Sequence, residues 1–262
     1  MYYFSFLYDN IFLVIVMEYT KSIIKKFRRK IWSKFVRAVK EYELINEGDK
    51  IAVCLSGGKD SITLLNALKA LQRFYPKHFD LIAISVNPGF ENFDSELLQK
   101  NCDEIDVPLF IENSSIKEIV FDVRKEKNPC SLCANLRRGI INSVAIREGC
   151  NKIALGHNMD DVLETFLLNL LYTGSLSTFA PKSFMDRTKI TLIRPLIFLS
   201  EKDTRHFVKK YNKSVMSKVC PMDEHTKRET MKEQIFLWQK DIPMVRANLF
   251  GAISRNLDGW KK

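Results

Sequence analysis

The sequence predicts an α/β fold: a doubly wound, mostly parallel sheet of five strands, with a basic N-terminal helix and a C-terminal helical appendage. Short apolar runs of strand length alternate with helical stretches between residues 49 and 198. Polar or glycine-rich segments follow several of these runs, at the edge where parallel sheets bind their ligands. With 262 residues, 46% of them hydrophobic, the chain can bury the core that such a domain needs.

The first predicted strand leads into a glycine-rich turn. Residues 51–55 (IAVCL) are apolar, which predicts a strand buried on both faces, and apolar residues then recur at helical spacing from Ile62 to Leu71. Glycines between a buried strand and a helix let the backbone approach a ligand, at which the unpaired helix N–H groups point. We therefore expect a phosphate site, with added charge from Lys59, in the six residues of the turn: Ser56, Gly57, Gly58, Lys59, Asp60 and Ser61.

Four further apolar runs complete the predicted sheet. They cover residues 81–86, 107–111, 153–155 and 190–193, and a helical stretch over 91–104 lies between the first two. Asn87 and the pair Gly156-His157 follow two of these strands. Because the carboxyl ends of parallel strands meet at one edge, these segments should lie near the glycine-rich turn.

Residues 1–17 are predicted to be a non-native or disordered extension, with translation starting at Met17. The apolar stretch over residues 1–16 lacks a basic leader and a cleavage site, and it is shorter than the ~20 residues that span a bilayer. The alternative is an anchor at a membrane surface. Six cysteines are too few for a disulfide scaffold, so we expect a cytoplasmic protein without a membrane partner.

Residues 18–48 predict a basic helical segment. Nine Lys and Arg residues and no acidic ones lie between Lys21 and Lys40, and they supply most of the formal net charge of +10. Such a face could be solvated or lie on anionic lipid, but we favour contact with nucleic-acid phosphates. An apolar stripe would dock the helix on the body: Ile24, Phe27, Ile31 and Phe35.

A second polar stretch, GHNMDD (residues 156–161), precedes a helix. Adjacent carboxylates at a helix start could cap it, or they could hold Mg²⁺ against a pyrophosphate. We favour the metal role for Asp161, and less strongly for Asp160, because the stretch follows a strand that faces the phosphate loop. His157 could be a core histidine, a nucleotide contact or a proton-transfer group.

The cysteines divide by context. Cys130-Ser131-Leu132-Cys133 is a C-x-x-C pair, which in a cytosolic protein indicates a metal, an iron–sulfur cluster or a redox pair. Cys54 lies inside a strand and is expected to be inert, whereas Cys220 lies in a polar loop. Three thiols could therefore share one cofactor: Cys130, Cys133 and Cys220. Zinc would take His225 as a fourth ligand, whereas a [4Fe-4S] cluster would keep one iron open.

Residues 199–262 predict a helical region. Ser200 and Asp203 read as a capping box ahead of a helix that ends near residue 211. A second helix is expected over residues 224–239, with Met231, Ile235 and Trp238 on one face. Lys227 and Arg228 could touch RNA or be solvated.

SGGKDS after a strand resembles the PP-loop of ATP pyrophosphatases, which have the adenine nucleotide alpha hydrolase-like fold. The order of motifs resembles the tRNA 2-thiocytidine synthetase family from about residue 19 to the end: SGGKDS, CSLCANLRRG, GHNMDDVLETFLLNLLYTG, RPL and VCPMDEHTKRE. The resemblance implies sulfur insertion at the C2 carbonyl of a tRNA cytidine in the anticodon loop. ATP would adenylate the carbonyl oxygen, and sulfur carried on the open iron of a [4Fe-4S] cluster would displace AMP.

The resemblance also implies the site residues. Residues 56–61, with Gly156 and His157, would bind the nucleotide, and Asp161 would bind Mg²⁺ or act in catalysis. Lys59 would stabilise the departing pyrophosphate. Cys130, Cys133 and Cys220 would hold the cluster, and Arg137 and Arg138 would face the nucleotide or the tRNA. Some family members have another cysteine where this chain has Met222 and Asp223.

The implied partners are tRNA and a sulfur donor such as a cysteine desulfurase, and a homodimer is a possible assembly. Two other functions share part of the pattern. A lysidine-type tRNA ligase would use SGGKDS but has no need of three cysteines. A zinc-stabilised RNA-binding protein would use the cysteines without the nucleotide chemistry.

Overall fold

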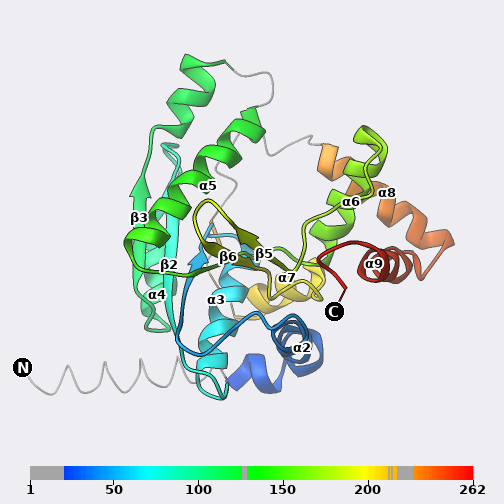
Figure 1. The fold of residues 1–262 in the computed structure, drawn as a ribbon, viewed down its shortest axis with the longest axis horizontal. Helices are drawn as coiled ribbons and strands as arrows, with labels where there is room; N and C mark the ends of the chain where they lie inside the picture. The colour runs from blue at the N-terminus through cyan, green and yellow to red at the C-terminus, as the bar shows by residue number, and fades with distance from the viewer. Residues whose placement is uncertain (1–20, 126–128, 212, 214, 217–226, 262) are drawn as a thin grey trace, which may run out of the picture.

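The computed structural model describes residues 21–125, 129–211, 213, 215–216 and 227–261. A six-stranded sheet with the order β3-β2-β1-β4-β6-β5 forms its centre (Figure 1). All neighbouring strands are parallel except β5 and β6, which confirms the mostly parallel α/β prediction. The strands are β1 (Asp49–Cys54), β2 (Phe79–Asn87), β3 (Leu109–Asn113), β4 (Lys152–Ala154), β5 (Lys182–Met185) and β6 (Ile190–Ile193).

The predicted number of five strands is wrong, because the edge strand β5 was not recognised. Its sequence, KSFM, alternates exposed and half-buried residues and so lacks the apolar run that marks the other strands. It pairs antiparallel with β6 from Lys182 opposite Ile193 to Met185 opposite Ile190. β3 begins at Leu109 rather than at the predicted residue 107, after Pro108, which has no N–H to donate to a ladder.

Helices cover both faces of the sheet, as a doubly wound fold requires. Alternate residues of β1 enter two separate cores: Ile51 and Val53 pack with α3, whereas Ala52 packs with α5. The helices are α2 (Ser33–Glu41), α3 (Lys59–Gln72), α4 (Ser95–Asp103), α5 (Pro129–Arg147), α6 (Met159–Thr173), α7 (Glu201–Lys210), α8 (Lys227–Asp241) and α9 (Val245–Asn256), with π-helical turns η1 (Arg28–Trp32) and η2 (Glu118–Val123).

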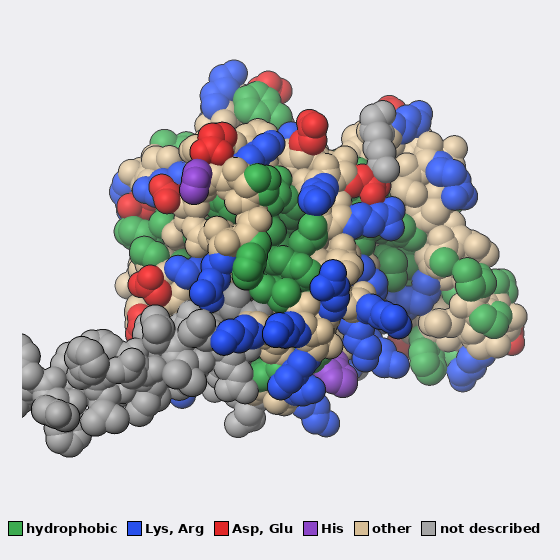
Figure 2. Space-filling model, turned by 90° about the horizontal axis from the view of Figure 1, so that it is seen from below, with side chains coloured by type: hydrophobic (Ala, Val, Ile, Leu, Met, Phe, Trp, Pro, Cys, Tyr) green, Lys and Arg blue, Asp and Glu red, His purple; other side chains and the backbone are tan. Residues whose placement is uncertain are grey.

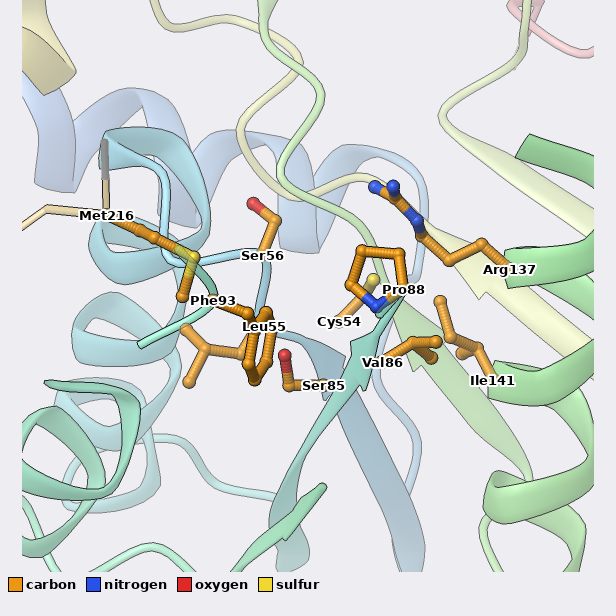
Figure 3. Close-up of a pocket in the computed structure, with 10 residues that line it drawn as sticks. All are labelled: Cys54, Leu55, Ser56, Ser85, Val86, Pro88, Phe93, Arg137, Ile141 and Met216. Carbon is orange, nitrogen blue, oxygen red and sulfur yellow. The ribbon is translucent and has the colours of Figure 1, made fainter. Parts of the chain in front are cut away.

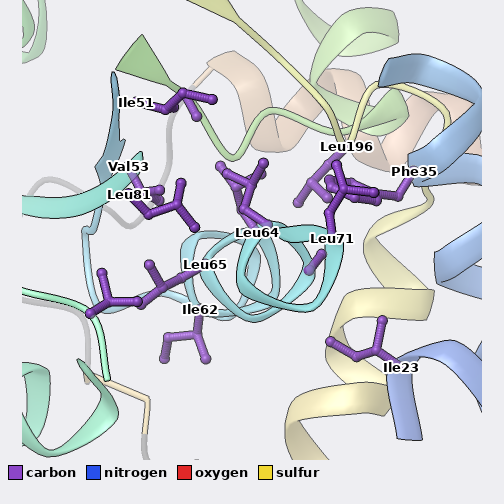
Figure 4. Packing of buried hydrophobic residues seen from close by; sticks show 14 of the residues in the cluster. Ile23, Phe35, Ile51, Val53, Ile62, Leu64, Leu65, Leu71, Leu81 and Leu196 are labelled. Carbon is purple, nitrogen blue, oxygen red and sulfur yellow. The ribbon is translucent and has the colours of Figure 1, made fainter. Parts of the chain in front are cut away.

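The N-terminal segment packs into the same core as α3. Phe35 lies beside Leu71 and Leu196 (Figure 4). The predicted apolar stripe is correct except at its start, where Ile23 is buried and Ile24 is half-buried. The buried positions recur every four residues, and each such step overshoots one α-helical turn by about 40°. The wider π-turn η1 absorbs this overshoot, so that the stripe continues to face the core.

The C-terminal helices form a third core with α6. Met231 and Ile235 of α8 are buried there, and Trp238 packs against them, as predicted. Helix α9, which the sequence reading did not single out, completes this layer. The predicted capping box at the start of α7 is wrong in detail, because the Ser200 hydroxyl donates to the Asp203 carboxylate instead of capping the backbone.

A basic face covers the N-terminal helices. Its side chains are exposed and carry no acidic neighbour in sequence: Lys25, Lys26, Arg28, Arg29 and Lys30. Lys and Arg gather on the side of the molecule that Figure 2 shows. In Figure 1, α2 lies near the amino ends of the strands, whereas α5 begins at the opposite end of the molecule. Within the described ranges, no helix is both long and apolar enough to cross a bilayer.

Candidate active site

The glycine-rich turn joins β1 to α3 at the carboxyl edge of the sheet. Gly57 has a φ of +76°, a conformation that favours glycine. The Ser61 hydroxyl donates to the Gly58 carbonyl at 2.9 Å, and the Ser56 hydroxyl donates to that of Ser61 at 3.2 Å. Gly58 is the N-cap of α3 and offers no side-chain acceptor, so the first N–H groups of the helix have no side-chain cap. Such a terminus binds anions.

Gly156 supports this turn from the neighbouring strand. A Cβ atom at Gly156 would lie 3.1 Å from the Ser61 nitrogen and 3.2 Å from the Asp60 carbonyl carbon. Only a residue without a side chain lets the segment after β4 pack this closely against the first turn of α3. The prediction that these two segments lie close together is therefore confirmed. The contact that Gly156 makes in this structure is with the backbone of Asp60 and Ser61.

Lys59 lies in an acidic setting. Its Nζ is 3.0 Å from Asp60 Oδ2 and 3.1 Å from Glu201 Oε1 on α7. Burial lowers the Lys59 pKa, but these two carboxylates more than offset it, so the pKa is raised. Lys59 therefore carries its positive charge beside the glycine turn, ready for a phosphate group.

Asp60 connects two helices. Its Oδ1 accepts a 2.6 Å hydrogen bond from the Thr204 hydroxyl on α7, and its Oδ2 contacts Lys59. Asp60 thus fixes the start of α3 against α7. In this structure it positions the predicted phosphate site.

A pocket opens beside the turn at the carboxyl ends of β1 and β2 (Figure 3). Burial raises the pKa of Cys54 to about 11, which keeps this thiol protonated and fits the prediction that it is inert. Ser56 and the Arg137 guanidinium flank a mostly apolar floor, a combination suited to a nucleoside next to a phosphate site. The lining residues are Cys54, Leu55, Ser56, Ser85, Val86, Pro88, Phe93, Arg137, Ile141 and Met216.

Asp161 caps α6. Its Oδ2 accepts from the Asn158 backbone N–H at 2.9 Å, while the Asn158 side chain accepts from the Asp161 N–H, which forms a capping box. Its Oδ1 lies 3.4 Å from Arg228 of α8, in a polar pocket that also contains Lys59. The capping alternative is therefore confirmed. A metal role would use Oδ1, which faces the pocket.

Asp160 makes structural contacts. It is buried, and its Oδ2 accepts from the Glu201 backbone N–H at 2.7 Å. Its Oδ1 contacts the Arg246 guanidinium of α9. Asp160 thus fastens α6 to α7 and α9, and both of its oxygens are already engaged.

The polar pocket contains two charged residues that sequence reasoning missed, Glu201 and Lys232, together with Arg228, which was expected to touch RNA or be solvated. Lys232 contacts Glu201 at 3.1 Å, and Arg228 Nε lies 3.7 Å from Glu164. Burial raises the pKa of Glu164 to about 7, with a further contribution from Asp161. Glu164 is therefore partly protonated at neutral pH, which suits a group that transfers protons.

His157 lies under the aromatic ring of Phe179, with 4.7 Å between ring centroids. Burial, and then the charge of Arg194, lower the His157 pKa to about 3. The imidazole is therefore neutral across the physiological range, which excludes a resting imidazolium. Its Nδ1 is buried and has no hydrogen-bond partner within the described structure.

The C-x-x-C pair occupies the first turn of α5. Cys130 is exposed and Cys133 half-buried, and both are free thiols. Arg137 Nη2 lies 3.5 Å from Cys133 Sγ. Cys220 and His225, like Met222 and Asp223, lie outside the described residues. The residues that the structure describes contain no group of three or more His, Cys, Asp or Glu side chains that could hold a metal ion.

Comparison with known proteins decides the family. The PP-loop domain matches residues 27–237. A tRNA-cytidine(32) 2-sulfurtransferase of Dichelobacter nodosus is 38% identical over 90% of this chain and 88% of that protein. The chain belongs to the tRNA 2-thiocytidine synthetase family of PP-loop proteins. The resemblance drawn from the motifs is thus confirmed.

A further relative supports this family, and a solved structure shares the fold. A tRNA-cytidine(32) 2-sulfurtransferase of Syntrophotalea carbinolica is 38% identical over 86% of this chain and 88% of that protein. The solved structure of the U34-tRNA thiolase NcsA from Methanococcus maripaludis, with its [4Fe-4S] cluster, aligns with a TM-score of 0.70 at 24% identity. It covers 87% of this chain and 79% of that chain. At 24% identity, this alignment shows that the two proteins share a fold.

Proposed function

We propose that this protein is an ATP-dependent tRNA sulfurtransferase that replaces the C2 oxygen of the cytidine at position 32 with sulfur, as its relatives are named to do. One residue carries the proposal. Arg137 lines the pocket beside Ser56, and the same guanidinium contacts Cys133. This shared contact supports the proposal that the nucleotide pocket and the cysteine pair serve one reaction, as sulfur transfer to an activated base requires.

The residues of the glycine turn activate the base. The N–H groups at the start of α3 and the charge of Lys59 would hold the phosphates of ATP, with the adenosine in the adjacent pocket. The base oxygen attacks the α-phosphorus, the α–β bond breaks, and pyrophosphate leaves with the charge that Lys59 stabilises. The oxygen then departs from the base as part of AMP, a far better leaving group than oxide.

The sulfur chemistry would depend on the thiolates. A [4Fe-4S] cluster held by Cys130, Cys133 and Cys220 would supply sulfur to the activated carbon. The two described thiols fit this group, because they share one helical turn, neither is fully buried, and Cys133 contacts the Arg137 guanidinium. Cys220 lies four residues beyond Met216, whose N–H donates to the Gly57 carbonyl at 3.0 Å.

Mg²⁺ is part of the proposal. This ion usually keeps several waters and binds through one or two carboxylates together with substrate phosphates. Asp161 Oδ1, which faces the pocket that contains Lys59, can supply such a carboxylate once phosphates occupy the site. A site of this kind needs no group of three protein ligands.

The basic face of the N-terminal helices would bind the tRNA backbone. It lies at the end of the molecule opposite the start of α5 (Figure 1), so its contacts would be with parts of the RNA distant from the target base. A cysteine desulfurase as sulfur donor, a homodimer and a cytoplasmic location complete the proposal.

Cysteine substitution tests this function. Replacing Cys130 or Cys133 with Ser should abolish 2-thiocytidine formation, measured by nucleoside mass spectrometry, while ATP binding measured by titration survives. Cys150→Ala, at a buried cysteine just beyond the other end of α5, is the matched control. An equal loss of ATP binding in the Ser variants would contradict separate nucleotide and sulfur sites.

Metal analysis distinguishes the proposed sulfurtransferase from the alternative RNA-binding function. After anaerobic purification, the sulfurtransferase should be brown and contain iron and sulfide. A colourless protein with stoichiometric zinc would instead indicate a zinc-stabilised RNA-binding protein, which would bind tRNA without consuming ATP.

A further inference from the structure

The carboxyl end of α6 presents three large apolar side chains to solvent. Leu171 is 59% exposed, Tyr172 50% and Leu176 66%. The steps assigned above to ATP and the cysteines do not use them. Exposed apolar side chains that gather in one place mark contact surfaces, unlike those scattered singly over a protein. This end of α6 is therefore a candidate contact surface.

Tyr172 is held on a fixed element. Gly174 ends α6 with a φ of +65°, and its N–H donates to the Asn169 carbonyl. The Asn169 side chain in turn donates to the Ser177 carbonyl at 2.9 Å, which folds the following loop back along the helix. Because the ring is already in place, little conformational entropy is lost when a partner packs on it.

A cation from α8 lies against the Tyr172 ring. Lys227 Nζ is 4.3 Å from the ring centroid, and half of the Tyr172 side chain stays exposed for a flat partner. The sequence has no acidic residue from 165 to 185, and Glu229 of α8 lies 3.7 Å from Lys232. An exposed aromatic ring beside a lysine suits an unpaired nucleotide, whose base stacks while its phosphate pairs with the cation.

Tyr172 lies on the face of α6 that leads to the proposed active site. It is 11 residues from Asp161, which is three helical turns or about 16 Å, and Thr165 lies on the same face. Arg228, next to Lys227, contacts Asp161 at 3.4 Å and Thr165 at 3.0 Å. In Figure 1, α6 ends and α8 begins at the same end of the molecule as the start of α5, which carries the cysteine pair.

We propose that Tyr172 and Lys227 form a stacking platform for an unpaired base of the RNA substrate, a base other than the one that is modified. This inference rests on the proposed function. The platform holds the RNA loop at the active-site end of the molecule by stacking, whereas the basic face at the other end holds the RNA by charge.

Loss of the ring tests the platform. Tyr172→Ala should weaken binding of an anticodon stem-loop RNA by about tenfold in a filter assay, whereas Tyr172→Phe, which keeps the ring, should bind within about twofold of wild type. Phe236→Ala is the matched control, because Phe236 is 62% exposed and has Lys240 at 5.4 Å but lies farther along α8. Wild-type affinity in Tyr172→Ala would overturn the inference. So would a change in oligomeric state, measured by ultracentrifugation, without a loss of RNA affinity, since the surface would then dock a second copy.

The salt dependence of binding separates the two halves of the platform. Stacking releases no counterions, so Tyr172→Ala should keep the wild-type slope of log affinity against log salt. Lys227→Gln should reduce that slope by about 0.7, the value for one phosphate contact to a single strand, and Lys240→Gln should not. An unchanged slope in Lys227→Gln would overturn the assigned phosphate contact.

Ultraviolet cross-linking locates the contact directly. Irradiation of wild-type protein with the stem-loop RNA should yield a cross-linked peptide that contains Tyr172, identified by mass spectrometry, and its absence would contradict the platform. Binding and cross-linking need neither ATP nor sulfur. If wild type binds this RNA but forms no 2-thiocytidine, the proposed function fails and the binding data still decide the platform. If thiolation proceeds and Tyr172→Ala keeps the wild-type KM for tRNA, only the platform fails.

Discussion

At the scale of single residues, burial sets the charges around the glycine turn. It lowers the pKa of His157 to about 3 and raises that of Glu164 to about 7. Lys59 keeps its charge because Asp60 and Glu201 lie within 3.1 Å. The site therefore offers a fixed cation for phosphates, a carboxyl group that can exchange protons near neutral pH, and an imidazole that remains neutral.

The His157 pKa predicts a pH dependence of stability. The unfolded chain takes up a proton on this imidazole near pH 6.5, but the folded chain does so only near pH 3. The free energy of unfolding that is fully present above pH 6.5 is therefore lost progressively as the pH falls toward 3. Urea unfolding should show a steeper loss between pH 6.5 and 4 for wild type than for His157→Gln. The control is His78→Gln, at an exposed position, and equal slopes for wild type and His157→Gln would contradict the prediction.

Sequence motifs revealed only part of the site at this scale. The glycine turn, Gly156, Asp161 and the C-x-x-C pair were found because each occupies a short, recognisable segment. Glu201 and Arg246 were missed, and the contact of Arg228 with Asp161 was not predicted, because α7, α8 and α9 bring these residues to the site only by tertiary packing. No local pattern distinguishes these charges from those of an ordinary solvated helix.

At the scale of elements, the close approach of the segment after β4 to the start of α3 shapes the phosphate site. Gly156→Ala should push the first turn of α3 outward, because its Cβ would lie 3.1 Å from the Ser61 nitrogen. We expect ATP affinity, measured by calorimetric titration, to fall about tenfold, equal to about 1.4 kcal/mol. Gly139→Ala on α5, where a Cβ meets nothing within 4 Å, should leave it unchanged. Unaltered ATP affinity in Gly156→Ala would show that this contact does not set the site.

Burial pattern explains which elements could be predicted. β1, β2 and β6 were located to within two residues at each end because continuous apolar runs mark strands covered on both faces. β5 lies at the sheet edge with half of its residues exposed, so its sequence carries little of that signal. The π-helical turn η1 could not be predicted either, because it depends on how the whole N-terminal segment packs against the core.

At the scale of the whole molecule, the chemistry and the main basic face lie at opposite ends of the sheet (Figure 1). This separation suits a large substrate that is held in one place and modified in another. Arg29→Gln and Lys30→Gln should each reduce the slope of log affinity against log salt for tRNA by about 0.7 to 0.9. Filter binding over a salt series measures this slope, and Lys100→Gln, at an exposed position on α4, is the control. Slopes that match wild type would remove the basic face from the RNA contact.

The most direct test of the central claim is to quantify AMP and 2-thiocytidine in one reaction of wild-type protein with tRNA, ATP and sulfide under anaerobic conditions. Adenylation of the base by the glycine turn predicts equal amounts of the two products, with pyrophosphate and without ADP. Release of ADP in their place, or 2-thiocytidine formed without ATP, would contradict it.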